Sequence, residues 1–377
     1  MIRPTGKICA ESNMKPGTPK SALDTPALLI DLDAFDRNVA RMAGTFKRAG
    51  VGWRPHTKGI KVPALAHRLI AAGAHGVTCA KVSEAEVMAN AGIRDILIAN
   101  QVIGEQKVRR LAFLCHQADV IVGMDSTVGI EQLDRAAAEA GSRPRVVVEV
   151  DTGMNRCGVA PGDAAVALAK RVADTKHLRF AGFMAWEGHC AAIKDPDEKR
   201  AAVYEAIGKL TGSADAARSG GLPVEIVSCS GTGTYQIAAA VPGITEVQAG
   251  GGALGDVHYR DHFGVDHECA LTIITTVISR PNDRVIVTDG GFKTFGTVNG
   301  LPEPIGIAGD VIERVALSAE HGRLILKEPM EAPRIGDILE WTVGYSDSTV
   351  FLHDTLHGLR DGILHSTWQI AGRGKLQ

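Results

Sequence analysis

A lysine at the end of a predicted strand is the residue of this sequence best placed for chemistry. Lys58 closes the segment Trp53-Arg-Pro-His-Thr-Lys58, and the run from Val51 to His56 has the composition of a strand. If this strand belongs to a β/α barrel, a lysine ammonium that points into the barrel mouth costs free energy unless it is paired with an opposite charge or bonded covalently. A desolvated lysine is a nucleophile suited to carbonyl groups. Spacing alone also allows a solvated lysine ahead of a helix, so carbonyl chemistry is a hypothesis at this point.

Two glycine-rich segments have the composition of an anion-binding site. Ser230-Gly231-Thr232-Gly233 follows a predicted strand and precedes a predicted helix, and Gly250-Gly251-Gly252 follows the next strand. Glycines let the backbone approach an anion, and the N–H groups at the start of a helix face it. Either segment alone could be an ordinary tight turn. Together they favour a phosphate site of the kind that β/α barrels build after consecutive strands.

The elements that must position these groups alternate between short apolar runs and longer segments of helical period. From Thr25 onward this alternation is typical of repeated βα units. Eight units predict an α/β fold with a closed (β/α)8 TIM-type barrel, although a doubly wound open sheet shares the pattern. The expected strands are Val51–His56, Gly76–Ala80, Asp95–Ala99, Val120–Met124, Arg145–Asp151, Arg179–Trp186, Val224–Cys229 and Thr245–Ala249. The expected helices include Val62–Ala72, Ser83–Ala91, Gln106–His116, Ile130–Ala140, Ala164–Asp174 and Glu198–Ser219.

After about Ala270 the sequence changes to β-rich segments without intervening helices, which predicts a second, all-β domain. We therefore expect three parts: an N-terminal arm or disordered tail over residues 1–24, the barrel over 25–270 and the C-terminal β domain over 271–377. The strands expected in the last part are Leu271–Ile278, Arg284–Thr288, Val311–Leu317, Arg323–Leu326, Ile338–Thr342 and Gly362–Gln369.

Composition excludes several classes of partner. The 41 Lys and Arg residues nearly balance 43 Asp and Glu, and they are scattered along the chain rather than gathered in blocks. Nucleic acids and anionic membranes select such blocks, so neither partner is expected. The chain has no apolar run of about 18 residues and no apolar segment near its start. These features predict a cytoplasmic protein that acts on a small molecule.

Separated motifs in register make the chain resemble the D-threonine aldolase and D-serine dehydratase family, whose wider kin are the alanine racemases. The resemblance runs from about residue 24 to residue 375. The motifs that carry it are Asp24-Thr-Pro-Ala-Leu-Leu-Ile-Asp-Leu-Asp33, Arg54-Pro-His-Thr-Lys58, Lys81-Val-Ser-Glu-Ala, Glu149-Val-Asp-Thr-Gly-Met-Asn-Arg-Cys-Gly158, Gly231-Thr-Gly233 and Ala371-Gly-Arg-Gly374.

The resemblance implies a cofactor, pyridoxal 5′-phosphate (PLP), bound in a β/α barrel that is followed by a β domain, usually in a homodimer with its sites near the subunit boundary. It makes Lys58 the Schiff-base lysine and places His56, in the same motif, beside the cofactor. Both glycine-rich segments then hold the phosphate. Arg156 matches a family arginine near the pyridine ring, where a guanidinium keeps the ring nitrogen unprotonated, or it contacts the ring hydroxyl.

The sequence departs from this family where a metal is expected. In these aldolases and dehydratases a His-x-Asp or His-x-Cys pair near the C-terminus holds a divalent metal that contacts the substrate β-hydroxyl. Here Tyr345 stands in the place of the histidine, and Asp347 keeps the place of the carboxylate. One carboxylate is a poor transition-metal site, although a hydrated magnesium could use one. A metal at Asp347, whether magnesium, manganese or zinc, is therefore left open.

Two further positions differ from the family pattern. His189, in Trp186-Glu-Gly-His189, is the only imidazole near the place where relatives carry a histidine, and an ordinary structural histidine is its alternative. Gly252 replaces an aromatic residue that many relatives carry beside the phosphate. Without a metal, Tyr345, Asp347 or His189 must accept the proton of the β-hydroxyl.

Three functional hypotheses follow. The first is a PLP-dependent lyase of the D-threonine aldolase type, which cleaves or dehydrates β-hydroxy D-amino acids. The second is a PLP-dependent amino-acid racemase or epimerase that uses Lys58 and Tyr345 on opposite faces of the substrate Cα. The third is a non-catalytic PLP-binding protein on the same barrel, against which the β-rich C-terminal third argues.

Overall fold

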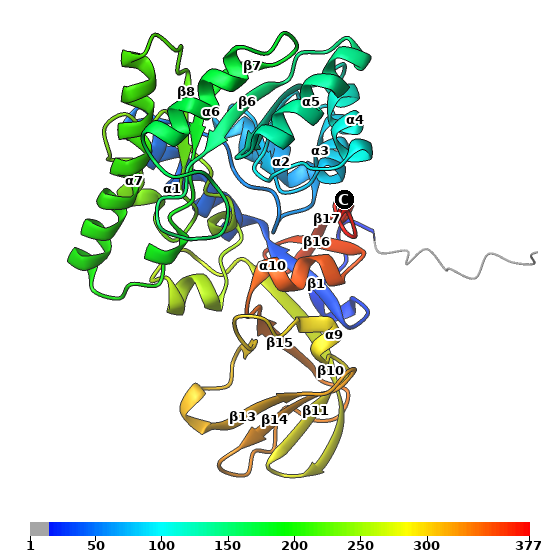
Figure 1. Ribbon diagram of the computed structural model, residues 1–377. Helices are drawn as coiled ribbons and strands as arrows, with labels where there is room; N and C mark the ends of the chain where they lie inside the picture. The colour runs from blue at the N-terminus through cyan, green and yellow to red at the C-terminus, as the bar shows by residue number, and fades with distance from the viewer. Residues whose placement is uncertain (1–14) are drawn as a thin grey trace, which may run out of the picture.

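The computed structural model describes residues 15–377, and its first feature is a closed barrel of eight parallel strands (Figure 1). The strands run in the order β2-β9-β8-β7-β6-β5-β4-β3, and a parallel bridge between His56 and Thr78 joins the two ends of this order. The strands expected from the sequence are confirmed: β2 (Gly52–Trp53), β3 (Val77–Cys79), β4 (Asp95–Ile98), β5 (Asp119–Met124), β6 (Arg145–Glu149), β7 (Arg179–Met184), β8 (Ile226–Cys229) and β9 (Glu246–Val247).

Helices surround the barrel, and their ends follow ordinary capping rules. The side chains of Asp31, Ser126 and Asp195 accept backbone N–H groups at the start of α1, α5 and α7. Gly50 and Gly141 end α1 and α5 in the left-handed conformation that glycine allows. The helices are α1 (Leu32–Ala49), α2 (Pro63–Ala71), α3 (Val82–Asn90), α4 (Glu105–Leu114), α5 (Thr127–Ala140), α6 (Asp163–Ala173), α7 (Pro196–Ser219) and the short α8 (Tyr235–Ala238).

The barrel interior is apolar in its middle and charged at the end where the strands begin. Apolar side chains from five consecutive strands meet in the middle, namely Leu97, Ile121, Val147, Ala181 and Ile226. This filling makes the barrel a packed core rather than a pore. The carboxyl ends of the strands, which carry the predicted site, lie at the other end.

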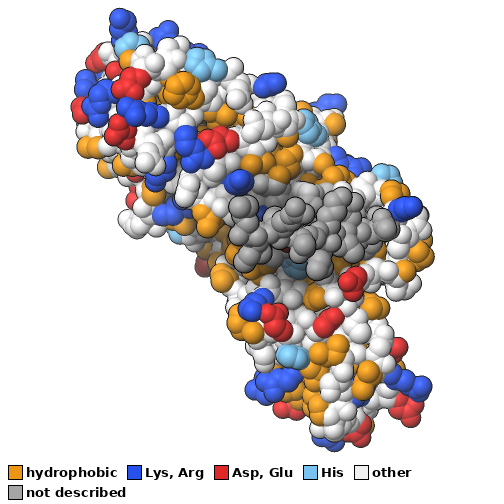
Figure 2. All heavy atoms as spheres, turned by 90° about the vertical axis from the view of Figure 1, so that its right-hand side faces the viewer, with side chains coloured by type: hydrophobic (Ala, Val, Ile, Leu, Met, Phe, Trp, Pro, Cys, Tyr) orange, Lys and Arg blue, Asp and Glu red, His pale blue; other side chains and the backbone are white. Residues whose placement is uncertain are grey.

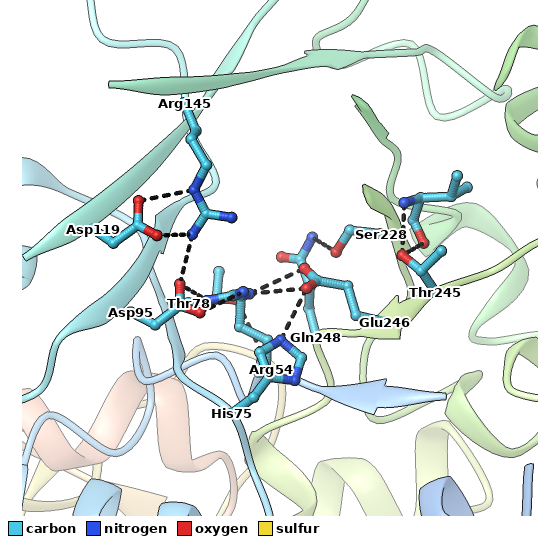
Figure 3. A network of polar contacts seen from close by, with 11 residues as sticks. Arg54, His75, Thr78, Asp95, Asp119, Arg145, Ser228, Thr245, Glu246 and Gln248 are labelled. Atoms are coloured by element: carbon cyan, nitrogen blue, oxygen red, sulfur yellow. Dashed lines mark hydrogen bonds and ion pairs between the residues drawn. The ribbon is translucent and has the colours of Figure 1, made fainter. Parts of the chain in front are cut away.

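A network of ion pairs closes the end where the strands begin (Figure 3). The Arg54 guanidinium, 2% exposed, donates to Glu246 at 3.1 Å and to Asp95 at 2.7 Å. Arg145 contacts Asp95 at 3.1 Å and also Asp119, while His75 contacts Glu246 at 3.0 Å. The buried charge of Arg54 is therefore matched by two carboxylates, as a charge in a barrel core must be.

A second, nine-stranded sheet extends below the barrel in Figure 1. Its main order is β13-β14-β11-β10-β1-β16-β17, and β15 pairs with β10 and β12. Its strands are β1 (Ala27–Asp31), β10 (Leu271–Asn282), β11 (Val285–Thr288), β12 (Glu303–Pro304), β13 (Ile312–Leu317), β14 (Gly322–Leu326), β15 (Ile338–Thr342), β16 (Thr355–Arg360) and β17 (Ile363–Gln369).

The expected C-terminal β domain is confirmed, and the structure differs from the expectation in two details. Strand β1 lies inside the range 25–270 expected for the barrel, although it was not among the eight expected barrel strands, and it pairs with β10 and β16 in the second sheet. Helices were not expected after Ala270, yet α9 (Phe292–Phe295) and α10 (Ser346–Thr349) each form one turn. The domain boundaries at 25–270 and 271–377 stay a prediction. Strand β1 belongs to the second sheet although it lies inside the first of these ranges. The expected arm lies outside the described residues over 1–14. In its described part, the N–H groups of Gly17 and Lys20 donate to the carbonyl oxygens of Leu364 in β17 and of Gly362 just before it.

The surface agrees with the balanced composition. On the face shown in Figure 2, basic and acidic side chains are mixed rather than gathered by sign. Among residues 15–377, no helix has the length and the apolar composition needed to cross a bilayer.

Candidate active site

A cavity of about 550 Å³ opens where the barrel strands end, and nearly every loop that follows a strand contributes to it. Lys58 comes from the loop after β2, Arg156 from the loop after β6, and the glycine-rich segments from the loops after β8 and β9. Tyr345 and Asp347 reach the same cavity from the second sheet. The cavity therefore collects most of the residues that the sequence singled out.

Lys58, Asp347 and Tyr345 form one contact group. The Nζ of Lys58 lies 3.0 Å from Oδ2 of Asp347, and the Tyr345 hydroxyl donates to the same oxygen at 3.1 Å. Burial and the Asp347 charge raise the pKa of Tyr345 above its usual value. The phenol is thus a proton donor to Asp347 at neutral pH. Gly59 makes this approach possible, because a Cβ at that position would lie 2.1 Å from Oδ1 of Asp347.

A buried carboxyl fixes the segment that carries Tyr345 and Asp347. Asp256 accepts the backbone N–H groups of Tyr259 at 2.7 Å and Ser346 at 2.8 Å. Burial raises the pKa of Asp256 to about 6 in spite of these two hydrogen bonds. One side chain therefore joins the π-helical turn His258–His262 to the first residue of α10.

The glycine-rich loops present backbone N–H groups to the cavity. Within residues 15–377, the N–H groups of Thr232, Gly233, Gly250 and Gly251 donate no hydrogen bond, although all four residues line the cavity. A Cβ at Gly250 would lie 2.2 Å from the carbonyl oxygen of His56, so only glycine brings the backbone this close. Unpaired N–H groups in the lining of one cavity are suited to binding an anion.

Ser230 and Gly252 belong to these loops in different ways. Ser230 lines the cavity with a positive φ of 69°, and its hydroxyl contacts Thr234 at 2.8 Å. Gly252 lies behind the cavity, and its N–H donates to the Thr232 hydroxyl at 2.9 Å. Gly252 is thus a link between the two loops rather than part of the lining.

Arg156 and His56 occupy two further parts of the lining. Arg156 is half-exposed and lies 3.7 Å from the buried carboxylate of Glu149, whose other oxygen accepts a hydrogen bond from Gln101. Burial, together with the Lys58 charge, lowers the pKa of His56 to about 3, so its imidazole is neutral. The Lys58 N–H donates to Nδ1 of this ring at 3.3 Å.

His189 does not line the cavity, so the structure does not support it as a base. Its side chain is exposed and lies over Gly153, where a Cβ would be 3.0 Å from Nε2. The turn Gly188–Cys190 explains this placement, because it directs Gly188 toward the cavity and the following residue away from it.

Several lining residues were not singled out from the sequence. Gln101 follows the end of a barrel strand, which is a signal that could have found it. Trp186 lines the cavity, and the rings of His258, Tyr259 and Phe263 form an aromatic cluster in its lining. The His258 ring lies 4.8 Å from that of Tyr345, and burial lowers the pKa of His258. Asn299 comes from a loop of the second sheet for which the sequence gives no local signal.

These residues fit PLP but make a poor site for a transition metal. One cavity offers an amine, unpaired N–H groups for a phosphate and a guanidinium, which are the groups that PLP requires. Among the described residues, no cluster of three or more His, Cys, Asp or Glu side chains could hold a metal. Asp347 already contacts Lys58 and Tyr345. The donors at the expected metal position are thus one paired carboxylate and a protonated phenol.

Comparison with known proteins gives two family matches and close full-length relatives. Residues 30–257 match the family "Alanine racemase, N-terminal domain", and residues 270–359 match "Putative serine dehydratase domain". The chain is 34% identical to a D-threonine aldolase of Arthrobacter sp. over 96% of this chain and 95% of that one. It is also 34% identical to a 3-hydroxy-D-aspartate aldolase of Paracoccus denitrificans (strain Pd 1222), with the same coverage. The crystal structure of D-threonine aldolase from Filomicrobium marinum matches with a TM-score of 0.92 and 38% identity, over 96% of this chain and 99% of that one.

Proposed function

The chain belongs to the alanine racemase N-terminal domain family and, within it, to the group of the D-threonine and 3-hydroxy-D-aspartate aldolases, and from this premise we propose that it is a PLP-dependent lyase acting on β-hydroxy D-amino acids. The reaction is retro-aldol cleavage to glycine and an aldehyde, or dehydration. The observation that carries the proposal is the meeting of Lys58, Asp347 and the glycine-rich loops in one cavity.

Each of these groups has a role in the proposal. When bound, PLP supplies an electron sink for the bond that breaks at the substrate Cα. Lys58 binds its aldehyde covalently, and the N–H groups of Gly233 and Gly251 hold its phosphate. Arg156, which lines the cavity and lies 3.7 Å from Glu149, would contact the cofactor ring.

Asp347 accepts the proton of the substrate β-hydroxyl. Both of its donors, the Lys58 ammonium and the Tyr345 hydroxyl, contact Oδ2. Oδ1 lies beside Gly59 and accepts no hydrogen bond within residues 15–377, and we assign the substrate hydroxyl to this oxygen. Tyr345 orients the carboxylate through its hydrogen bond to Oδ2. No step is assigned to a metal, because the donor set at this position suits a transition metal poorly.

The alternative of a racemase rests on the presence of Lys58 and Tyr345 in the same cavity. In that reaction Tyr345 must remove the Cα proton of one enantiomer, which requires an ionised phenol, and return a proton to Cα of the other, which requires the neutral phenol. Burial and the nearby carboxylate raise its pKa, which opposes this role. A non-catalytic PLP carrier would not need Tyr345 or Asp347, and the second sheet brings both to the cavity.

The proposal includes a homodimer in the cytoplasm. Its support for the dimer is a group of exposed apolar side chains, Val298, Leu301 and Ile305, that flanks the cavity residue Asn299. Exposed apolar groups of this kind are typical of subunit contacts. The six cysteines among residues 15–377 are all free, which suits a reducing compartment.

The test is a panel of D- and L-amino acids with wild-type protein, Lys58→Ala and the exposed-lysine control Lys107→Ala, each with and without EDTA. We expect wild type and the control to release an aldehyde plus glycine, or a keto acid plus ammonia, from β-hydroxy D-amino acids only. Lys58→Ala should be inactive. Release of neither product pair from any β-hydroxy D-amino acid would overturn the proposal.

A further inference from the structure

A buried imidazole joins the two glycine-rich loops from behind the cavity. Nδ1 of His267 lies 2.6 Å from the carbonyl oxygen of Gly252, and its Nε2 lies 2.9 Å from the Tyr235 hydroxyl. Tyr235 is the first residue of α8, the helix that the first loop opens. Gly252 belongs to the second loop and donates its N–H to Thr232 of the first. His267 thus contacts the second loop and the helix that the first loop opens, and it does not line the cavity.

The hydrogen bonds define which atom donates. The carbonyl of Gly252 can only accept, so Nδ1 of His267 carries the hydrogen. Gln236 donates to the phenol oxygen of Tyr235 at 3.2 Å, which leaves the phenol hydrogen for Nε2 of His267. Burial lowers the pKa of His267, in agreement with this neutral form.

Gly252 and His267 depend on each other sterically. A Cβ at Gly252 would lie 2.9 Å from both Cε1 and Nδ1 of the imidazole and 3.0 Å from the Thr232 methyl group. The imidazole is 7% exposed and fills the space beside the loop. A larger residue at 252 therefore has to displace either His267 or Thr232.

We propose that His267 is a positioning residue that holds the two loops in register, so that their N–H groups converge on the phosphate of the cofactor. The inference rests on the proposed function, since it assumes that PLP is the ligand. His267 acts through Gly252 and Thr232 and does not touch the phosphate. Loss of its hydrogen bonds lets the loops separate and weakens the phosphate contacts alone.

The test compares pyridoxal 5′-phosphate with pyridoxal, which lacks the phosphate. Dissociation constants for both are measured by absorbance titration of wild type, His267→Leu, His267→Asn and Tyr235→Phe. Removing two buried hydrogen bonds should weaken PLP binding by about tenfold or more in His267→Leu, while pyridoxal binding stays unchanged. His267→Asn can keep the donor to Gly252 and should lose less. His357→Asn, which removes a buried imidazole of the second sheet, should change neither constant.

The ratio of the two constants decides between the possible outcomes. A ratio that stays at the wild-type value in His267→Leu and in the isosteric Tyr235→Phe overturns the positioning role and leaves the proposed function intact. Equal weakening of both ligands also overturns it, because that result reports a damaged fold. A wild-type protein that binds PLP no more tightly than pyridoxal overturns the proposed function itself.

Discussion

Replacing Glu246 with glutamine should destabilise the protein by an amount that depends on pH. Glu246 is 4% exposed and receives hydrogen bonds from Arg54 and His75 in the network of Figure 3. Burial alone would raise its pKa, but the hydrogen bond from His75 and the Arg54 charge outweigh burial and lower the pKa from 4.5 to about 2. At about 1.4 kcal/mol per pKa unit, this difference corresponds to roughly 3 kcal/mol of stability.

The sign of the pH dependence follows from the direction of the shift. A carboxyl with a lowered pKa in the folded state contributes fully above its unfolded pKa and loses that contribution as the pH falls from 4.5 toward 2. At pH 7 the Glu246→Gln variant should therefore unfold with a free energy about 3 kcal/mol below that of wild type. The deficit should shrink steadily below pH 4.5, because wild-type Glu246 then becomes protonated as well.

Urea unfolding followed by tryptophan fluorescence at several pH values measures this difference, with Trp53 beside the network as a probe. Glu225→Gln is the matched control, because Glu225 pairs with Arg179 at 2.7 Å on the exposed surface. That substitution should cost less than about 1 kcal/mol. A deficit for Glu246→Gln that is absent at pH 7, or that stays constant down to pH 2.5, would refute the reasoning.

Other substitutions test the cavity. Asp347→Asn should slow product formation at least about 100-fold in steady-state assays, because the proposed proton acceptor is lost, while PLP still binds. An unchanged rate would contradict that role. Gly59→Val should slow the reaction similarly, since its side chain would displace Asp347, whereas Gly208→Ala, which meets no atom within 4 Å, should not. Dialysis against EDTA should leave the wild-type rate unchanged. A loss of activity that added metal restores would contradict the inference that Asp347 and Tyr345 bind a transition metal poorly. Glu149→Gln should raise the dissociation constant for PLP several-fold in titrations, because Arg156 loses its charged partner.

The barrel could be predicted from the sequence because its signals are local. Each strand is a short apolar run, and each candidate residue of the barrel follows such a run within a few positions, as Lys58 follows β2. Strand β1 has the same apolar composition, but its partners Ile273 and His357 lie more than two hundred positions away. The periodicity of a segment indicates that it is a buried strand, but it does not indicate which sheet the strand joins.

The residues that the sequence did not reveal depend on side-chain direction or on distant partners. His189 was named because it lies near the expected position in the chain, but one helical turn directs it out of the cavity. His267 was not named, since its partners are 15 and 32 positions away and form no motif. Asp347 could be placed only through the resemblance, because its contact with Lys58 joins two sheets.

Tyr345 stands where the family pattern predicts a metal-binding histidine, and this difference also affects the neighbouring Asp347. A neutral histidine offers a lone pair to a metal, whereas a protonated phenol offers a hydrogen, and at Tyr345 that hydrogen is directed at Asp347. The carboxylate is therefore held by donors on one oxygen, and its other oxygen approaches the backbone at Gly59. A carboxylate fixed in this way is a Brønsted base beside the Lys58 amine, which we propose as the group that binds the cofactor. If this chain cleaves β-hydroxy amino acids, the proton of the hydroxyl has a direct acceptor, and the reaction needs no Lewis acid at this position.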